Sequence, residues 1–198
     1  MNDFIAIDFE TATYSPDSAI SIGLVKYHNY KPIGSYYSLI RPPKLYIRPD
    51  FTAIHGLVLT DVKDAPDFKY IWEHEVEEFI GTTILAAHNA AFDMRVLRST
   101  LKYYDVPVPA VSYFCSCKLS KKVWPVCRSH SLSNLAARLN IIYNAHNALA
   151  DAETCGKIIN LCAREIVSSL DKKSGKNTRM PLNKLLEKVN VKVRTLGG

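Results

Sequence analysis

The amino-acid sequence predicts an α/β fold in which a mixed β-sheet is flanked by helices. Three short runs rich in β-branched and aromatic residues follow one another near the N-terminus, as in a strand meander. Two further apolar runs then alternate with stretches of helical periodicity. This order of strands followed by interleaved strands and helices is typical of a mixed sheet covered by helices. The 198 residues suffice for one sizeable domain.

The first part of the chain predicts a buried strand followed by a hairpin. Residues 4–9 form a short apolar run that reads as a buried strand. Residues 19–28 and 33–40 are two more strand candidates, and a turn over Asn29–Pro32 would join them as an antiparallel hairpin. Residues 41–50 contain three prolines, so we expect a loop there.

In the rest of the chain, predicted helices alternate with predicted strands. Residues 67–80 have apolar side chains at helical spacing and end at Gly81, and residues 82–87 are short enough for a strand. Asn89 is the expected N-cap of a helix over residues 90–103, and residues 111–115 are the fifth strand candidate. Ser131 would begin another helix, and residues 148–167 carry the longest helical pattern.

Composition narrows the class of protein. No run of 18 apolar residues occurs, so we expect no membrane contact, and the N-terminus lacks the pattern of a signal peptide, so we expect a cytoplasmic location. Five unevenly spaced cysteines do not form a disulfide framework. A zinc site from Cys115, Cys117, Cys127 and His130 is the weaker alternative to ordinary thiols, because the Cys-Ser-Cys spacing is too tight. The glycines form no phosphate-binding loop.

The net charge of +6 is concentrated at the C-terminus, where residues 171–198 hold eight basic and two acidic residues. We therefore expect a domain over residues 1–170 followed by a basic tail over residues 171–198. This tail could hold a phosphate backbone or be a solvated extension. Its amphipathic stretch, residues 181–186, could dock on a partner or on the domain itself.

Two acidic residues end the first predicted strand. Because side chains alternate along a strand, Asp8 and Glu10 share one face while Phe9 points to the core. Their Cα atoms would be about 6.6 Å apart. Two carboxylates so close on an apolar strand repel each other, and a divalent cation would relieve that repulsion. A surface strand end is the alternative reading.

Two further segments, residues 88–93 and 146–151, each begin with His-Asn and end with aspartate. If Asn89 caps its helix, Asp93 lies near the helix N-terminus, which favours a carboxylate. His88 is better explained as a structural residue of the turn. In the second segment Asn147 would cap the helix, which leaves His146 on the preceding loop and Asp151 in the first turn. A histidine beside carboxylates can serve as a general base, although a plain loop histidine is the alternative.

The segments IDFET, HNAAFD and HNALAD together resemble, in order and spacing, the three motifs of the DEDDh family of 3′→5′ exonucleases. That family includes the epsilon proofreading subunit of bacterial DNA polymerase III. Its tyrosine subfamily has Tyr where this chain has Asn147, so the histidine version fits better. The resemblance implies an RNase H-like five-stranded mixed sheet flanked by helices, and it makes residues 1–170 an exonuclease domain.

The resemblance also implies the site. Two divalent cations, Mg²⁺ or Mn²⁺, would be held by four carboxylates, and His146 would be the general base that completes the catalytic set. The implied metal ligands are Asp8, Glu10, Asp93 and Asp151. The implied substrate contacts are Phe9, Thr11, Ile54, His55, Leu57, Asn89 and Phe92. A basic stretch over residues 118–128 could carry the strand or be solvated surface.

The function that these expectations predict is metal-dependent hydrolysis from single-stranded 3′ ends, with release of nucleoside 5′-monophosphates. We expect DNA rather than RNA as the substrate, and a role in replication proofreading or DNA repair, with contact to a DNA polymerase as a further option. Two alternatives stay open. One is an exoribonuclease that acts on RNA or oligoribonucleotides, and the other is a non-catalytic domain that binds nucleic acid or a polymerase.

Overall fold

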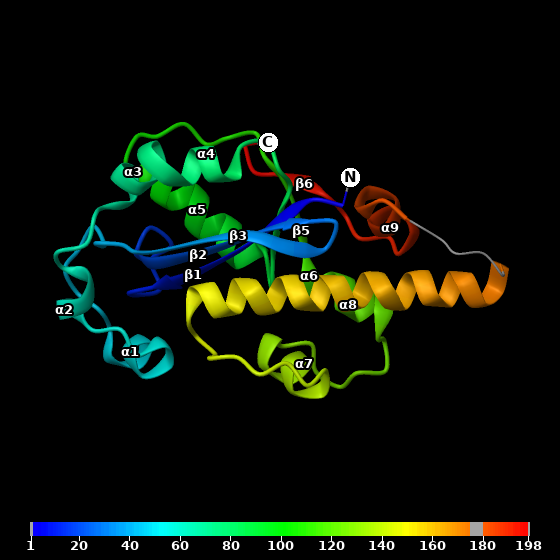
Figure 1. Ribbon diagram of the computed structural model, residues 1–198. Coiled ribbons are helices and arrows are strands. Elements are labelled where there is room, and N and C mark those ends of the chain that lie inside the picture. The colour runs from blue at the N-terminus through cyan, green and yellow to red at the C-terminus, as the bar shows by residue number, and fades with distance from the viewer. Residues whose placement is uncertain (1, 175–179, 198) are drawn as a thin grey trace.

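The structure, a computed structural model, describes residues 2–174 and 180–197. Its centre is a sheet of six strands in the order β3-β2-β1-β4-β5-β6 (Figure 1). The strands are β1 (Phe4–Thr11), β2 (Ala19–His28), β3 (Lys31–Leu39), β4 (Leu85–Ala87), β5 (Ser112–Cys115) and β6 (Arg194–Thr195). β2 runs antiparallel to β1 and β3, β4 and β5 run parallel to β1, and β6 pairs antiparallel with β5. The predicted mixed sheet is confirmed, with β6 as an additional edge strand.

The hairpin between β2 and β3 is tighter than predicted. Asn29 and Tyr30 alone form the turn, with φ of 50° and 63°, and pairing resumes at once between His28 and Lys31. Positive φ at both central residues is the geometry of a two-residue hairpin turn. Pro32 therefore lies in β3 rather than in the turn, which is tolerated because β3 is an edge strand.

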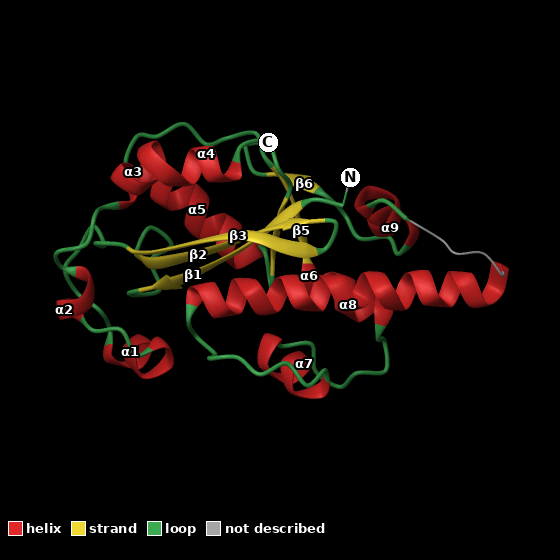
Figure 2. Cartoon of the chain, viewed as in Figure 1, coloured by secondary structure: helices red, strands yellow, loops and turns green. Residues whose placement is uncertain are grey.

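Helices cover both faces of the sheet (Figure 2). They are α1 (Pro49–His55), α2 (Leu59–Val62), α3 (Phe68–Ile71), the π-helical turn η1 (Trp72–Val76), α4 (Glu77–Ile80), α5 (Ala91–Tyr103), α6 (Ser116–Val123), α7 (Leu132–Arg138), α8 (Ala148–Ser174) and α9 (Leu182–Lys188). The helix expected over residues 67–80 is the run α3-η1-α4: Asp67 caps it by accepting from the Tyr70 N–H at 3.0 Å, and it ends at Gly81 with φ 52°. The loop expected over residues 41–50 ends earlier, because α1 begins at Pro49.

Alternation along β1 divides the hydrophobic core in two. Ile5, Ile7 and Phe9 belong to the cluster under α3 and α5, while Phe4 and Ala6 belong to the cluster under α8. The next positions on the α8 side are Asp8 and Glu10, so the two carboxylates continue an apolar stripe. The strand therefore delivers both acids to the face that α8 covers.

Part of the basic C-terminal segment packs on this sheet. The leucines of α9, at positions 182, 185 and 186, are buried in the cluster under α8, and Leu196 after β6 is buried in the other cluster. The Arg98 guanidinium donates to the Leu196 carbonyl at 2.7 Å and 3.2 Å. The amphipathic stretch thus docks on the domain itself. Lys176 and Arg179 lie outside the described residues. Within the described ranges, no helix combines the length and apolarity needed to span a bilayer.

Candidate active site

Asp8 lies at the centre of the site, on β1 and half-buried. Its neighbour in the β1–β2 pairing is Gly23, and the same row continues to Tyr37 on β3. A Cβ added at Gly23 would overlap the backbone of Ala148 and Leu149, at the start of α8. The missing side chain therefore lets the N-terminus of α8 lie directly on the sheet beside Asp8.

Asp93 stands in the first turn of α5 and is 1% exposed. Asn89, which we expected to be the N-cap, is not: Ala90 holds the cap position without a side-chain hydrogen bond. Asn89 instead adopts φ 70° and accepts from the Phe92 N–H through its carbonyl at 2.9 Å. Asparagine tolerates the left-handed region better than most residues, so it serves the β4–α5 turn by its backbone. Asp93 nevertheless reaches the helix N-terminus, as predicted.

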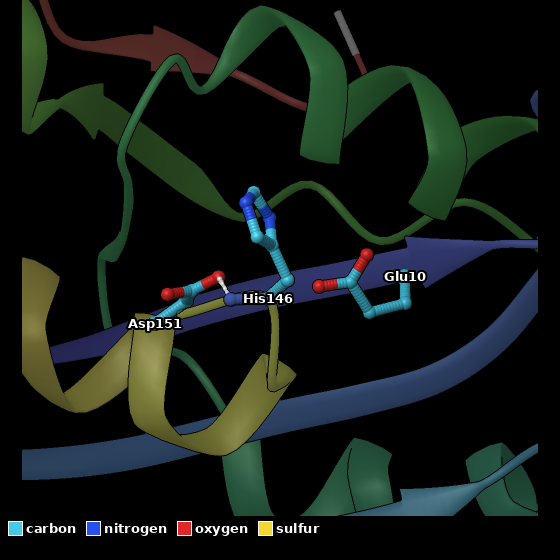
Figure 3. A group of neighbouring side chains, drawn as sticks. All are labelled: Glu10, His146 and Asp151. Atoms are coloured by element: carbon cyan, nitrogen blue, oxygen red, sulfur yellow. Dashed lines mark hydrogen bonds between the residues drawn. The ribbon is translucent and has the colours of Figure 1, made fainter. Parts of the chain in front are cut away.

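Asp151 enters from the first turn of α8. Asn147 caps this helix, since its Oδ1 accepts from the Ala150 N–H at 3.1 Å, as we expected. His146 lies on the preceding loop with φ 62°, and its backbone N–H donates to Asp151 Oδ2 at 3.1 Å. The cap thus places the exposed His146 ring and the Asp151 carboxylate on the same side of the helix end (Figure 3).

Three of the five predicted catalytic residues form a group that could hold a metal ion. One ligand atom each from Glu10, His146 and Asp151 lie within 4.8 Å of one another. Figure 3 shows the His146 ring rising between the two carboxylates. Asp8 and Asp93 stand outside this compact group, but repulsion from Glu10 and Asp151 raises the pKa of both.

All four carboxylates have a raised pKa. Repulsion by neighbouring carboxylates contributes at Asp8, Glu10 and Asp93, whereas at Asp151 burial alone raises the pKa and His146 lowers it. Burial is the largest cause at each: it raises the pKa of Glu10 to about 7, of Asp93 to about 8 and of Asp151 to about 6. Repulsion by Asp151 adds to the effect on Glu10, and repulsion by Glu10 and Asp151 adds to the effect on Asp93. The pKa of Asp8 is also raised, by burial and then by Asp93, Asp151 and Glu10 in that order. The charges of all four therefore act on one shared space.

No basic side chain neutralises this space. Among the described residues, no Lys or Arg forms an ion pair with any of the four carboxylates. Both oxygens of Asp93 and Oδ1 of Asp151 are buried and accept no hydrogen bond of normal geometry; the backbone N–H groups of Phe9 and Asp93 lie close enough only to offset part of the rise in the Asp93 pKa. Buried, unpaired carboxylate oxygens are costly unless a cation binds them. The donor set is mainly oxygen, which suits hard divalent cations.

The alternative zinc set does not assemble. In the part of the chain that the structure describes, Glu10, His146 and Asp151 are the only group of three or more potential ligands close enough to share an ion. His130 Nδ1 instead pairs with Ser120 Oγ at 2.9 Å, and Cys117 Sγ donates to the His130 carbonyl at 3.4 Å.

His88 is a structural residue, as its place in the turn suggested. Its Nε2 lies 2.8 Å from the His130 carbonyl and must donate to it, so Nδ1 accepts from the Ser116 hydroxyl at 2.8 Å. Burial lowers the pKa of His88, which keeps the ring neutral. The ring ties the β4–α5 turn to the start of α6 and to the loop before α7.

The residues expected to contact substrate divide into two groups. Phe9 and Thr11 are buried, at 2% and 4% exposure, and the Phe9 ring packs against Phe68 with centroids 6.2 Å apart. Neither side chain is open to solvent. Asn89 is exposed at the start of α5, and Phe92 is half-buried against the core.

The second group lies on and after α1. Ile54 is 53% exposed, and Leu57 packs partly against the small cluster around Val62. His55 is half-buried; burial and the nearby His146 lower its pKa, and its Nδ1 accepts from the Leu57 N–H at 3.1 Å. The end of α1 thus approaches the His146 side of the carboxylates.

Two tyrosines near the carboxylates were not foreseen. Burial is the main cause of the raised pKa of Tyr143, and Asp151 and Asp8 add to it. The hydroxyl groups of Tyr143 and Ser133 form a hydrogen bond of 3.1 Å, and Tyr143 precedes His146 by three residues. Burial raises the pKa of Tyr37, and Glu10 raises it further. The position of Tyr37 beside the site follows from the pairing of β2 with β3, which the sequence alone does not give.

Comparisons with known proteins identify the family of this chain. The profile of the exonuclease family RNase_T matches residues 5–159. The 3′-5′ exonuclease DinG of Staphylococcus aureus strain MRSA252 is 29% identical over 164 residues, which are 81% of this chain and 18% of that protein. DinG of Staphylococcus saprophyticus is 30% identical over 159 residues, 79% of this chain and 17% of that protein. The chain thus spans under a fifth of the length of these relatives.

Solved structures share the fold. Exonuclease X, solved with 5′ overhanging duplex DNA, superposes with a TM-score of 0.65 at 22% identity, covering 94% of this chain and 99% of that one. The nuclease domain of 3′hExo, a DEDDh family member bound to rAMP, gives 0.68 at 16% identity, covering 90% and 95%. Exonuclease I gives 0.71 at 16% identity, covering 83% and 41%. With the three motifs and the family match, the chain belongs to the RNase T-type exonuclease family, within the DEDDh group of 3′→5′ exonucleases.

Proposed function

We propose that this chain is a metal-dependent 3′→5′ exonuclease that removes nucleotides from single-stranded DNA ends and releases nucleoside 5′-monophosphates. The observation that carries the proposal is the meeting of four carboxylates and one histidine without a basic partner among the described residues. A structural role would leave the buried Asp93 carboxylate oxygens uncompensated, whereas a role in holding cations explains them.

We assign Asp8, Glu10, Asp93 and Asp151 to holding two divalent cations, Mg²⁺ or Mn²⁺. Bound there, such cations supply positive charge that stabilises the phosphorane-like transition state and makes water a better nucleophile. Protons compete with the cations for these carboxylates, so activity should depend on both pH and metal concentration.

His146 is the general base of the proposal. Its ring is exposed beside Glu10 and Asp151, and a ring nitrogen would take the proton of the attacking water. The bond between the last phosphorus and the preceding 3′-oxygen then breaks, and that oxygen leaves with a proton from solvent. The Asp151 side chain fixes the loop by accepting from the His146 backbone N–H, which keeps the ring near the carboxylates.

DNA is the substrate that we favour, because Exonuclease X, which covers almost the whole of this fold, was solved with DNA. RNA remains the second candidate, because 3′hExo was solved with rAMP. A role in replication proofreading or DNA repair, in the cytoplasm, completes the proposal; we favour an exonuclease that acts on its own, with contact to a DNA polymerase as the other option. The non-catalytic alternative predicts binding without cleavage.

The test uses matched DNA and RNA oligonucleotides labelled at the 5′ end, incubated with Mg²⁺, Mn²⁺ or EDTA. We expect a ladder that shortens from the 3′ end of DNA and is absent with EDTA. Asp8→Asn should abolish the ladder, whereas Asp64→Asn, at an exposed aspartate paired with Lys63, should not. Cleavage of RNA alone would move the assignment to the exoribonuclease, and binding without any cleavage would contradict the proposal.

A further inference from the structure

A cavity apart from the candidate active site lies at the end of the sheet where β1 finishes, between the loop after β1 and the loop after β3. Its volume is about 300 Å³, within the range of small-ligand sites. Its walls include Thr13, Asp17, Ser18, Lys44, Tyr46 and Tyr103. We propose that this cavity binds one nucleotide of the substrate strand, away from the scissile bond. The inference rests on the proposed function and adds a subsite to it.

The loop that forms one wall is held in place by its own hydrogen bonds. Ser18 Oγ accepts from the Thr13 N–H and from the Thr13 hydroxyl, each at 3.1 Å, and donates to the Ser15 carbonyl at 2.6 Å. The Ala12 N–H also donates to the Ser18 carbonyl at 2.8 Å. These bonds close the loop at its base, so the wall is formed before a ligand binds.

The opposite wall offers a cation without a partner. The segment between β3 and α1 carries three basic residues, and two are occupied: Arg41 pairs with Asp67 at 3.3 Å, and Arg48 pairs with Asp50 at 2.9 Å. Lys44 is exposed and forms no ion pair within residues 2–174 and 180–197. An unpaired lysine at the rim of a cavity suits a phosphate group.

Two aromatic rings supply a surface for a base. Tyr46 is 55% exposed and Tyr103 is 51% exposed, so both rings are open to a ligand in the cavity. Tyr103 is held by Tyr104, whose ring meets it edge-on with centroids 4.9 Å apart. Exposed tyrosines beside a lysine are a combination by which proteins hold single-stranded nucleic acid.

The Thr13 wall of the cavity lies close to the candidate active site along the chain. Thr13 is three residues beyond Glu10, so the two Cα atoms are within about 11 Å. The Arg48 N–H donates to the Ala12 carbonyl at 3.0 Å, which ties the lysine-bearing wall to the end of β1. The Asp17 carboxylate in the same cavity disfavours the two charges of a free monophosphate more than the single charge of a strand phosphate.

The test compares Tyr46→Ala, Tyr103→Ala and Lys44→Gln with two control variants on α3, Tyr70→Ala and Lys69→Gln. Tyr70 is 52% exposed and therefore matches the cavity tyrosines. Two substrates are used: a 5′-labelled DNA oligonucleotide, and the p-nitrophenyl ester of thymidine 5′-monophosphate, which is too small to span both sites. We expect each tyrosine variant to raise KM for the oligonucleotide about tenfold, and Lys44→Gln several-fold, with unchanged hydrolysis of the ester.

Unchanged KM values relative to the controls would overturn the subsite, as would an equal loss on both substrates, which would indicate damage to the active site or the fold. Added deoxyadenosine monophosphate distinguishes a free nucleotide from a nucleotide of the strand as the occupant of the cavity. If the variants relieve only its inhibition of ester hydrolysis, the cavity holds free nucleotide and the strand assignment is wrong. If the native protein cleaves neither substrate, the proposed function fails; oligonucleotide binding, measured by fluorescence anisotropy on the same variants, then decides the subsite.

Discussion

Ala148, the first residue of α8, lies with its backbone directly against Gly23 of β2, so closely that even a methyl group at Gly23 would overlap it. Gly23 is also the residue that pairs with Asp8 across β1 and β2. One glycine thus controls the approach of the helix that carries Asp151 to the strand that carries Asp8. The distance between two of the proposed metal ligands depends on a residue that has no side chain.

Gly23→Ala should therefore weaken the site more than the fold. The added methyl group must push the start of α8 away, at a cost of about 1–3 kcal/mol in unfolding free energy. Because Asp151 lies in the displaced turn, we expect Mn²⁺ affinity by calorimetry to fall at least tenfold and kcat to fall with it. Gly34→Ala on β3 is the matched control, since a Cβ there meets nothing within 4 Å. Equal metal affinity in the two variants would contradict this account.

Local patterns made much of the fold predictable. β2 has the predicted bounds, because an almost continuously buried run of residues ends at a hairpin turn. The caps at Ser131 and Asn147 were also predictable, since each side chain bonds an N–H three residues ahead. The clustering of Asp8, Asp93 and Asp151 followed from the three motifs together, and each motif alone was ambiguous.

Features that depend on distant contacts were not predictable. The need for glycine at position 23 arises from Ala148, far along the chain. Asn89 suits both an N-cap and a left-handed turn, so its sequence context could not decide between them. β6 has two residues and no strand pattern of its own. α6 has few apolar positions, so helical periodicity is not visible there, and its lysines indicate only a basic stretch that carries the strand or is solvated surface.

His146→Ala should lower kcat by about 10²–10⁴-fold. The proposed role is proton transfer, so Mn²⁺ affinity, measured by calorimetry on the same protein, should change little. His74→Ala serves as the control, because that exposed histidine lies on η1 and bonds the Tyr70 carbonyl. A large loss of metal affinity in His146→Ala would instead make the histidine a metal ligand, which its place within 4.8 Å of Glu10 and Asp151 allows.

The metal-free protein should lose stability as pH rises from about 4 to about 8. Asp93, Glu10 and Asp151 have pKa values of about 8, 7 and 6 in the fold, above the values of about 4 in an unfolded chain. Between these limits the folded state binds more protons than the unfolded state, so the unfolding free energy falls as pH rises. Tm in EDTA should fall across this range, and added Mg²⁺ should restore it at pH 8. A Tm that rises over the same range in EDTA would contradict the shared repulsion.

His88→Ala should affect stability rather than chemistry. The variant leaves the His130 carbonyl with only the weak Cys117 thiol donor, and the Ser116 hydroxyl can still donate to the Ala87 carbonyl at 3.3 Å. We therefore expect a total cost of about 1–3 kcal/mol in unfolding free energy if water does not replace the ring. Urea unfolding should show a lower midpoint, while kcat at a temperature where the variant is folded should stay within a few-fold of the native value. A loss of kcat as large as that of His146→Ala would make His88 part of the reaction.

Leu185→Ala should destabilise the whole domain. Leu185 on α9 is 0% exposed and packs in the same cluster as Phe4 and Ile158, so its removal leaves a cavity in the core under α8. Leucine-to-alanine changes at such positions cost about 2–5 kcal/mol. Lys184→Ala, at the adjacent exposed position, should change stability by less than about 0.5 kcal/mol, because its ion pair with Glu187 lies on the surface. One cooperative urea transition at a lower midpoint is expected for Leu185→Ala; a native midpoint would mean that α9 docks too weakly to matter.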